Sequence, residues 1–168
     1  MGAIRAVALD VDGVLTDGGF WWGPGGEEFK RFSFSDVMGI SLARKAGLAF
    51  ALISGENSPL IDRYAQKMGI EFVVKGCKDK ATALREFAAA RGLELAEVAF
   101  MGDDVNDLEA LKIAGLSAAP ANAHVSVRRV AMRVMAKTGG DGAVRELLDY
   151  VLARQSKPAP SSASLLPA

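Results

Sequence analysis

The chain has 168 residues; half of them are hydrophobic, 24% are charged, and 20 basic and 20 acidic side chains give a formal net charge of +0. This length and hydrophobic share predict one globular domain with a sizeable core. The balanced charge indicates neither nucleic acid nor an anionic membrane as a partner, and no apolar segment approaches the roughly 20 residues that span a bilayer. The single cysteine, Cys77, excludes an intramolecular disulfide. Because the N-terminus also lacks the layout of a signal peptide, we expect a cytoplasmic protein.

Short apolar runs alternate with helix-like segments along the chain. Strands are expected at residues 6–9, 48–53, 70–74, 98–101, 116–119 and 133–135. Helices are expected at residues 37–45, 59–68, 80–90, 107–114, 126–132 and 143–153, with Ser35 or Asp36 capping the first. This alternation is typical of an α/β fold with a doubly wound parallel sheet and crossover helices. We therefore predict one domain over residues 1–155, and a Pro-, Ser- and Ala-rich tail at 156–168 that is expected to be disordered.

An aromatic-rich segment follows the first predicted strand. Phe20, Trp21 and Trp22 precede a Gly- and Pro-rich turn, and Phe29 and Phe32 follow it. Two such runs around a turn predict a β-hairpin. The rings either form an exposed patch for a partner subunit or pack onto their own domain, and the sequence leaves both possibilities open.

Polar residues gather where the predicted strands end. Asp10 and Asp12 follow the first strand, Ser54 the second, Lys80 the third, and Asp103 and Asp104 the fourth. The carboxyl ends of parallel strands share one crevice, where ligands bind. Carboxylates from two strands suit Mg²⁺, while a lysine and a serine with its following amides can hold phosphate oxygens. One carboxylate then remains to act as a nucleophile, and a neighbouring one as a general acid.

These residues resemble the motifs of phosphatases of the haloacid dehalogenase (HAD) superfamily, in the small branch that lacks a cap domain. Residues 10–14 match the family's D-x-D-G-x motif, and Ser54, Lys80 and residues 102–107 match the other three. Within that branch, residues 15–18, 34–40 and 138–146 resemble phosphatases of 2-keto-3-deoxy sugar-acid phosphates. These enzymes act on 3-deoxy-D-manno-octulosonate (KDO) 8-phosphate or on nonulosonate (KDN) 9-phosphates. The likeness covers about residues 4–153 and implies Rossmann-like HAD topology.

The resemblance implies a mechanism and assigns roles to these residues. Asp10 would attack phosphorus and form an aspartyl phosphate, while Asp12 would protonate the leaving sugar oxygen and then activate water. The Asp10 carboxylate, the Asp12 backbone carbonyl and the Asp103 carboxylate would hold Mg²⁺. Ser54, Gly55 and Lys80 would bind the phosphate. Asp104 and Asp107 would support the site by orienting waters on the metal or Lys80.

The residues that would choose the substrate are less sharply marked. Glu56 stands where octulosonate phosphatases usually carry arginine, and together with Lys67 it resembles the nonulosonate type, although both could be ordinary solvated charges. Tyr64 departs from the basic residue expected nearby in that type, and Arg63 could substitute for it. The candidate substrate contacts are Thr16, Glu56, Arg63, Lys67 and Asn106.

Without a cap, the crevice of one subunit is open, and the resemblance implies a homotetramer with the hairpin at its interface. This favours Phe20, Trp21 and Trp22 as interface residues. Two alternatives remain open: a HAD phosphatase of another small sugar phosphate, and a receiver-like signalling module that accepts a phosphoryl group from a partner kinase.

Overall fold

The computed structural model describes residues 2–155, so the tail predicted at 156–168 lies outside the described residues. Its central sheet has the strand order β5-β4-β1-β6-β7-β8, and every pairing in it is parallel. The strands are β1 (Ala6–Leu9), β4 (Ala49–Ile53), β5 (Phe72–Val74), β6 (Val98–Met101), β7 (Leu116–Ala119) and β8 (Arg133–Val134). The predicted α/β doubly wound fold is confirmed.

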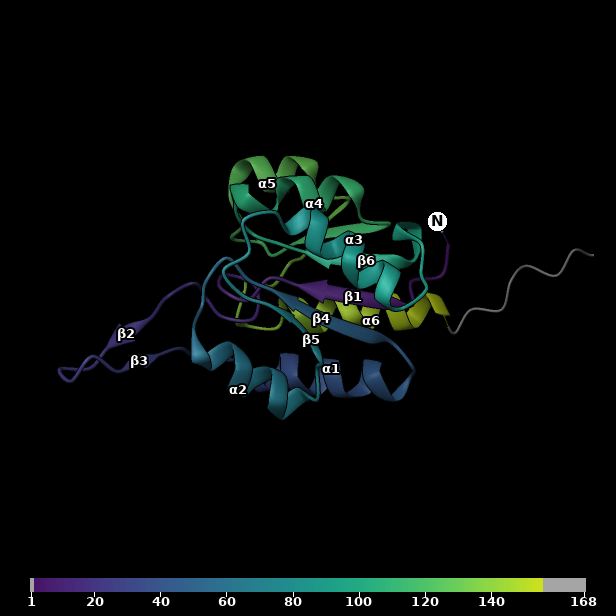
Figure 1. The fold of residues 1–168 in the computed structure, drawn as a ribbon. Coiled ribbons are helices and arrows are strands. Elements are labelled where there is room, and N and C mark those ends of the chain that lie inside the picture. Colours follow the sequence, from purple (N-terminus) through teal and green to yellow (C-terminus); the bar gives the residue numbers. More distant parts are fainter. Residues whose placement is uncertain (1, 156–168) are drawn as a thin grey trace, which may run out of the picture.

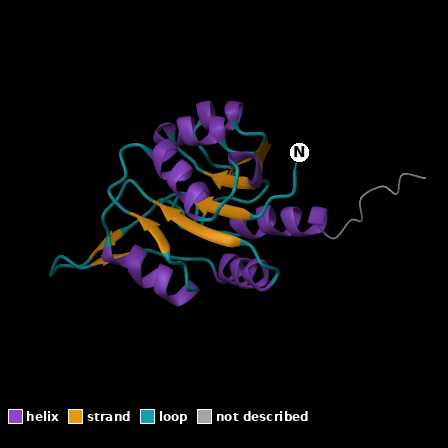
Figure 2. Cartoon of the chain, turned by 45° about the vertical axis from the view of Figure 1, so that its right-hand side comes forward, coloured by secondary structure: helices purple, strands orange, loops and turns teal. Residues whose placement is uncertain are grey.

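Helices cover both faces of the sheet (Figures 1 and 2). One face carries α1 (Phe34–Lys45), α2 (Pro59–Met68) and α6 (Ala143–Gln155). The other carries α3 (Lys80–Ala90), α4 (Leu108–Ile113) and α5 (Val125–Val130), and short 3-10 turns, η1 (Leu95–Glu97) and η2 (Val105–Asp107), precede β6 and α4. No helix among residues 2–155 is long and apolar enough to cross a membrane.

β1 lies in the middle of the sheet and separates two apolar cores. Val7 and Leu9 pack into the core beneath α1, α2 and α6, while Ala6 and Ala8 face the core beneath α3, α4 and α5. Both sets are fully buried, as expected for a parallel strand covered on two faces. From β1 the chain moves outward to β4 and β5, then returns to β6 on the other side. The switch point between β1 and β6 is therefore the place where a ligand crevice is expected.

The hairpin predicted after the first strand is present and extends away from the sheet (Figure 1). It pairs β2 (Trp21–Trp22) with β3 (Glu28–Phe29) in antiparallel register, with Trp21 opposite Phe29. Only two residues of each strand pair, and the Phe20, Trp21 and Trp22 side chains are largely exposed. The rings therefore do not pack onto the core of their own domain.

The predicted cap of the first helix is wrong. α1 begins at Phe34, three residues before the expected start, and Asp36 lies inside its first turn. The Asp36 carboxylate is fully buried and accepts hydrogen bonds from the backbone N–H groups of Gly142 (3.3 Å) and Arg145 (2.8 Å). Asp36 therefore caps the start of α6 instead, and it joins α1 to the turn that precedes α6.

We expect Asp36→Ala to lower the free energy of unfolding by about 1–3 kcal/mol, because two buried N–H groups lose their acceptor. Urea unfolding followed by circular dichroism measures this change. Asp149→Ala is the matched control, because Asp149 forms a partly exposed ion pair with the Arg145 side chain. This substitution should lower the free energy of unfolding by less than about 0.5 kcal/mol. Equal costs for the two variants would contradict the role given to Asp36.

Candidate active site

A cleft of about 360 Å³ opens at the carboxyl ends of β1, β4 and β6. The backbone N–H of Asp10 donates to the carbonyl of Met101 (3.0 Å) and fixes the end of β1 against β6. The residues that line the cleft are Asp10, Asp12, Gly18, Ser54, Gly55, Glu56, Asp103, Asp104 and Asn106. The structure thus brings together polar residues from three strand ends that are far apart in the sequence.

The loop after β1 is shaped by close contacts between backbone segments. Gly13 has a φ of +86°, and a Cβ added there would lie 2.0 Å from Oδ2 of Asp103. A Cβ on Gly139 would lie 1.8 Å from the carbonyl oxygen of Gly13, and the N–H of Gly140 donates to the carbonyl of Val14 (3.0 Å). The glycine-rich turn before α6 therefore supports the loop that carries Asp12, because neither segment has room for a side chain at the contact.

Thr16 supports the same loop and does not face the cleft. Its hydroxyl oxygen accepts hydrogen bonds from the N–H groups of Gly13 (3.3 Å) and Gly18 (3.2 Å), and the residue is fully buried. The structure therefore does not bring Thr16, a predicted substrate contact, to the lining of the cleft, because its side chain is turned into the loop.

A buried lysine joins two carboxylates beneath the cleft. Nζ of Lys80 lies 2.9 Å from Oδ1 of Asp10 and 2.6 Å from Oδ1 of Asp107. The other oxygen of Asp107 accepts from the backbone N–H groups of Asp103 (2.9 Å) and Asp104 (3.2 Å). Both oxygens of Asp107 are thus occupied, and the residue positions Lys80 and the loop after β6.

Negative charge accumulates at this point of the structure. Burial, together with the charges of Asp10 and Asp107, raises the pKa of Asp103 to about 8. Burial and the charge of Asp107 raise the pKa of Asp10 to about 6, although Lys80 acts in the opposite direction. Carboxyl groups resist ionisation in this way where carboxylates share a buried site with too little positive charge.

A divalent cation fits this arrangement. Asp10, Asp103 and Asp107 each offer an oxygen, and these atoms all lie within 4.8 Å of one another. Carboxylate oxygens are the ligands that Mg²⁺ prefers. Because both Asp107 oxygens are already bound, Asp10 and Asp103 are the side chains available to such an ion. The Asp12 carboxylate is not part of this group of three.

The opposite wall of the cleft suits a phosphate group. Ser54 follows β4, is buried, and its hydroxyl oxygen accepts the N–H of Glu56 (3.1 Å). A Cβ on Gly55 would lie 3.3 Å from the Asn106 side-chain nitrogen, so Gly55 and Asn106 face each other closely. Asp104 caps η2 by accepting the N–H of Val105 (2.7 Å) and also lines the cleft. This wall thus offers hydroxyl, amide and backbone groups to an anion.

The sequence did not identify Lys30, which contacts Asp12. Nζ of Lys30 lies 2.8 Å from Oδ1 of Asp12, and the Lys30 side chain is 4% exposed. Burial disfavours the charged amine, but the carboxylates of Asp12 and Glu28 outweigh it and raise the pKa of Lys30. A lysine directly after a hairpin strand, between Phe29 and Phe32, was the only available signal.

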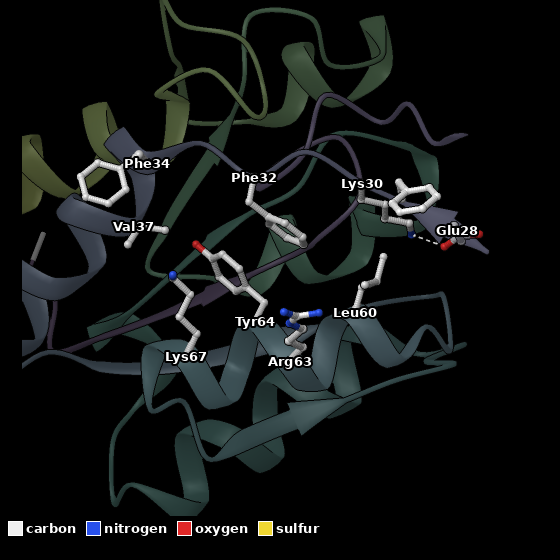
Figure 3. Close-up of a pocket in the computed structure, with 10 residues that line it drawn as sticks. Glu28, Lys30, Phe32, Phe34, Val37, Leu60, Arg63, Tyr64 and Lys67 are labelled. Carbon is white, nitrogen blue, oxygen red and sulfur yellow. Dashed lines mark ion pairs between the residues drawn. The ribbon is translucent and has the colours of Figure 1, made fainter. Parts of the chain in front are cut away.

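Arg63 and Lys67 do not line this cleft. They lie on α2 beside a separate groove of about 390 Å³, whose walls include Phe32, Leu60 and Tyr64 (Figure 3). The Tyr64 ring stacks on Phe32 with centroids 4.5 Å apart. The structure therefore does not bring the predicted substrate contacts Arg63 and Lys67 to the cleft of their own chain. Glu56 and Asn106 do line the cleft.

Comparison with known proteins gives one family. Residues 65–147 match the model of the haloacid dehalogenase-like hydrolases. The chain is 36% identical to 3-deoxy-D-manno-octulosonate 8-phosphate phosphatase of Haemophilus influenzae, over 92% of this chain and 86% of that protein. It is 37% identical to the enzyme of the same name from Yersinia pestis, over 92% and 82%.

Solved structures agree with these relatives. The phosphatase of Moraxella catarrhalis, crystallised with magnesium, phosphate and KDO, has a TM-score of 0.87 and 37% identity, over 89% of this chain and 86% of that one. The cobalt-bound enzyme of Haemophilus influenzae has a TM-score of 0.88 and 36% identity, over 92% and 90%. Both relatives were crystallised with a divalent metal, in agreement with the carboxylate cluster found here.

We expect Mg²⁺ to raise the melting temperature by roughly twice as much near pH 8.5 as near pH 5.5, because protons compete with the ion for Asp10 and Asp103. The raised pKa values mean that the metal-free folded chain binds more protons than the unfolded chain, so its stability falls as pH rises from about 4 to 8. The ion offsets that loss only where the carboxyl groups are ionised. Differential scanning fluorimetry with MgCl₂ or EDTA measures the effect.

Asp103→Asn is the control for this prediction, since it removes both a ligand and the carboxyl group whose pKa is raised to about 8. It should abolish most of the Mg²⁺ effect at both pH values. An equal stabilisation of the unmodified chain at the two pH values would show that the ion does not bind at these carboxylates.

Proposed function

The chain belongs to the haloacid dehalogenase-like hydrolases and is a phosphatase, and on this basis we propose that it is a Mg²⁺-dependent phosphomonoesterase of a 2-keto-3-deoxy sugar-acid phosphate. The proposal is supported above all by the cleft between β1 and β6, where Asp10 and Asp103 face Ser54 and Lys80 lies directly behind Asp10. KDO 8-phosphate is the proposed substrate, because it is the substrate in the names of the relatives. The receiver-like alternative is set aside, since these relatives are phosphatases.

In the proposed mechanism, the residues of the cleft divide the two steps of the reaction among them. An Asp10 oxygen forms a bond to phosphorus while the bond from phosphorus to the sugar oxygen breaks, and Asp12 gives its proton to that leaving oxygen. Asp12 then takes a proton from the water that cleaves the aspartyl phosphate. Lys80 and Ser54 stabilise the charge on the phosphoryl oxygens. Mg²⁺, when held by Asp10, Asp103 and the Asp12 carbonyl, supplies the remaining positive charge.

A nonulosonate 9-phosphate such as KDN 9-phosphate is the second candidate substrate. Glu56 supports it, because this residue lines the cleft and a carboxylate can accept hydrogen bonds from sugar hydroxyl groups. Lys67, the other residue that favoured this type, lies outside the cleft of its own chain.

We also propose a homotetramer and a cytoplasmic location. The exposed Phe20, Trp21 and Trp22 support the assembly, since Trp22 is 72% exposed and packs only partly against Phe20. Large exposed rings of this kind are typical of interfaces.

We expect Asp10→Asn to reduce kcat at least ~10³-fold, because the amide cannot form the covalent intermediate. Phosphate release under saturating substrate measures kcat, and mass spectrometry of the assayed sample excludes deamidation back to aspartate. Appreciable turnover by a variant that has not deamidated would contradict the assignment of Asp10 as the nucleophile. Asp17→Asn is the matched control, since Asp17 lies on the same loop but is exposed, and it should keep near-normal activity.

We expect kcat/KM for KDO 8-phosphate to exceed that for KDN 9-phosphate at least ~10-fold, a difference within the reach of a few substrate contacts. Phosphate release from both compounds, with and without EDTA, measures the ratio. A reversed ratio would favour the second candidate. If both compounds are inert while another sugar phosphate is hydrolysed, the proposed substrate class is wrong.

A further inference from the structure

The Asp12 carboxylate is held by a single polar contact among the residues that the structure describes. Its Oδ1 lies 2.8 Å from Nζ of Lys30. Its Oδ2 is buried and has no hydrogen-bond partner within residues 2–155. Asp10 is held quite differently, because Lys80 fixes it and Asp107 fixes Lys80 in turn. The orientation of the Asp12 carboxylate therefore depends on Lys30.

Lys30 is itself firmly placed. Its side chain is 4% exposed and forms part of the wall of the groove beside α2, close to Phe32 and Leu60 (Figure 3). Its ammonium also lies 3.5 Å from Oε1 of Glu28, the pair drawn in Figure 3. The lysine stem thus lines the groove, and the ammonium lies within 3.5 Å of both the Asp12 and the Glu28 carboxylate.

Glu28 ties this arrangement to the hairpin and to α2. Its carboxylate accepts a hydrogen bond from the indole nitrogen of Trp22 (3.3 Å) and another from the hydroxyl of Ser58 (3.5 Å). Ser58 is the N-cap residue of α2. A continuous set of polar contacts therefore runs from the start of α2 through Glu28 and Lys30 to Asp12.

We propose that Lys30 is the positioning residue of the proton-transferring carboxylate, and that it holds Asp12 in place from the base of the hairpin. The inference rests on the proposed function, which makes Asp12 the group that protonates the leaving oxygen. Lys30 acts through Asp12 and contacts neither the phosphoryl group nor the attacking atom. Proton transfer requires its donor within about 2.6–3.2 Å of the oxygen that receives the proton. Without the contact to Lys30, the Asp12 carboxylate spends less time within this distance of the leaving oxygen.

This role makes the effect of Lys30 depend on the leaving group. A sugar alkoxide is a poor leaving group and needs the proton as the bond to phosphorus breaks. The p-nitrophenolate ion leaves readily without one. Since kcat/KM covers the steps up to the first cleavage, loss of Lys30 should lower it for a sugar phosphate and change it little for p-nitrophenyl phosphate.

The test compares Lys30→Met with the unmodified enzyme on KDO 8-phosphate and p-nitrophenyl phosphate, both in Mg²⁺. Methionine keeps an apolar stem of similar length in the groove. We expect kcat/KM to fall roughly 10–100-fold for the sugar phosphate and less than about 3-fold for the aryl phosphate. Lys30→Arg should restore part of the loss, because arginine can also donate to Oδ1 of Asp12. Lys75→Met is the matched control, since Lys75 pairs with Asp62 away from the cleft, and it should leave both values unchanged.

A double-mutant cycle completes the test. Introduced into Asp12→Asn, Lys30→Met should cause no further loss, because the group through which it acts is already gone. Equal losses on the two substrates, a loss confined to KM, or additive losses in the cycle would each overturn the proposal. Failure of the proposed function is distinguishable, because the unmodified enzyme would then not hydrolyse KDO 8-phosphate, whether or not it hydrolyses p-nitrophenyl phosphate.

Discussion

The ion pair of Lys80 with Asp10 and Asp107 is the interaction on which the site depends. Three carboxylates meet at the ends of β1 and β6, and within residues 2–155 the buried Lys80 ammonium is the one cation that forms an ion pair with them. Burial raises the pKa of Asp10 and that of Asp103, and the negative charge that one cation leaves unneutralised raises them further. A phosphate dianion would meet the same excess of negative charge. Binding of a divalent cation and binding of phosphate are therefore linked, since the first removes the repulsion that opposes the second.

These carboxylates approach one another because the loops that carry them lack side chains at the contacts. Gly13 passes so close to Asp103 that a Cβ would overlap the carboxylate, and Gly139 passes equally close to the backbone of Gly13. The turn that contains Gly139 is held in place by Asp36, from α1. Support for the catalytic loop thus extends from the sheet through a glycine turn to a buried carboxylate of a helix. A substitution that displaces any of these contacts is therefore expected to displace the loop that packs against Asp103.

The sequence predicts the sheet and the strand-end residues well because both follow local rules. Buried parallel strands are short apolar runs, and the ends of such strands meet at one edge, so Asp10, Ser54 and Asp103 could be placed together before the structure was known. The prediction that Asp36 caps the first helix was wrong for a local reason as well, because an aspartate near the start of a helix is normally its cap. Its true partners lie more than 100 residues away. No local pattern reports a contact of that kind.

Side chains on irregular or amphipathic segments were harder to place. The spacing of Arg63 and Lys67 puts them on one side of a helix, but it does not say which neighbour that side meets. Lys30 follows a strand of only two paired residues, so no periodicity fixes the direction of its side chain. In each case the missing information was the position of another element, which only the folded chain supplies.

Asp10 and Asp12 are two residues apart and carry the same functional group, yet the structure holds them from different sides. Lys80, at the start of the core helix α3, fixes Asp10 beneath the cleft, as suits the proposed nucleophile, which must attack phosphorus along one line. Lys30, at the base of the hairpin, holds Asp12. A proton donor must meet the leaving group, the part of the substrate that extends out of the cleft. In the proposed mechanism, holding the nucleophile from the sheet core and the proton donor from the hairpin separates the half of the reaction that is the same for every substrate from the half that depends on the substrate.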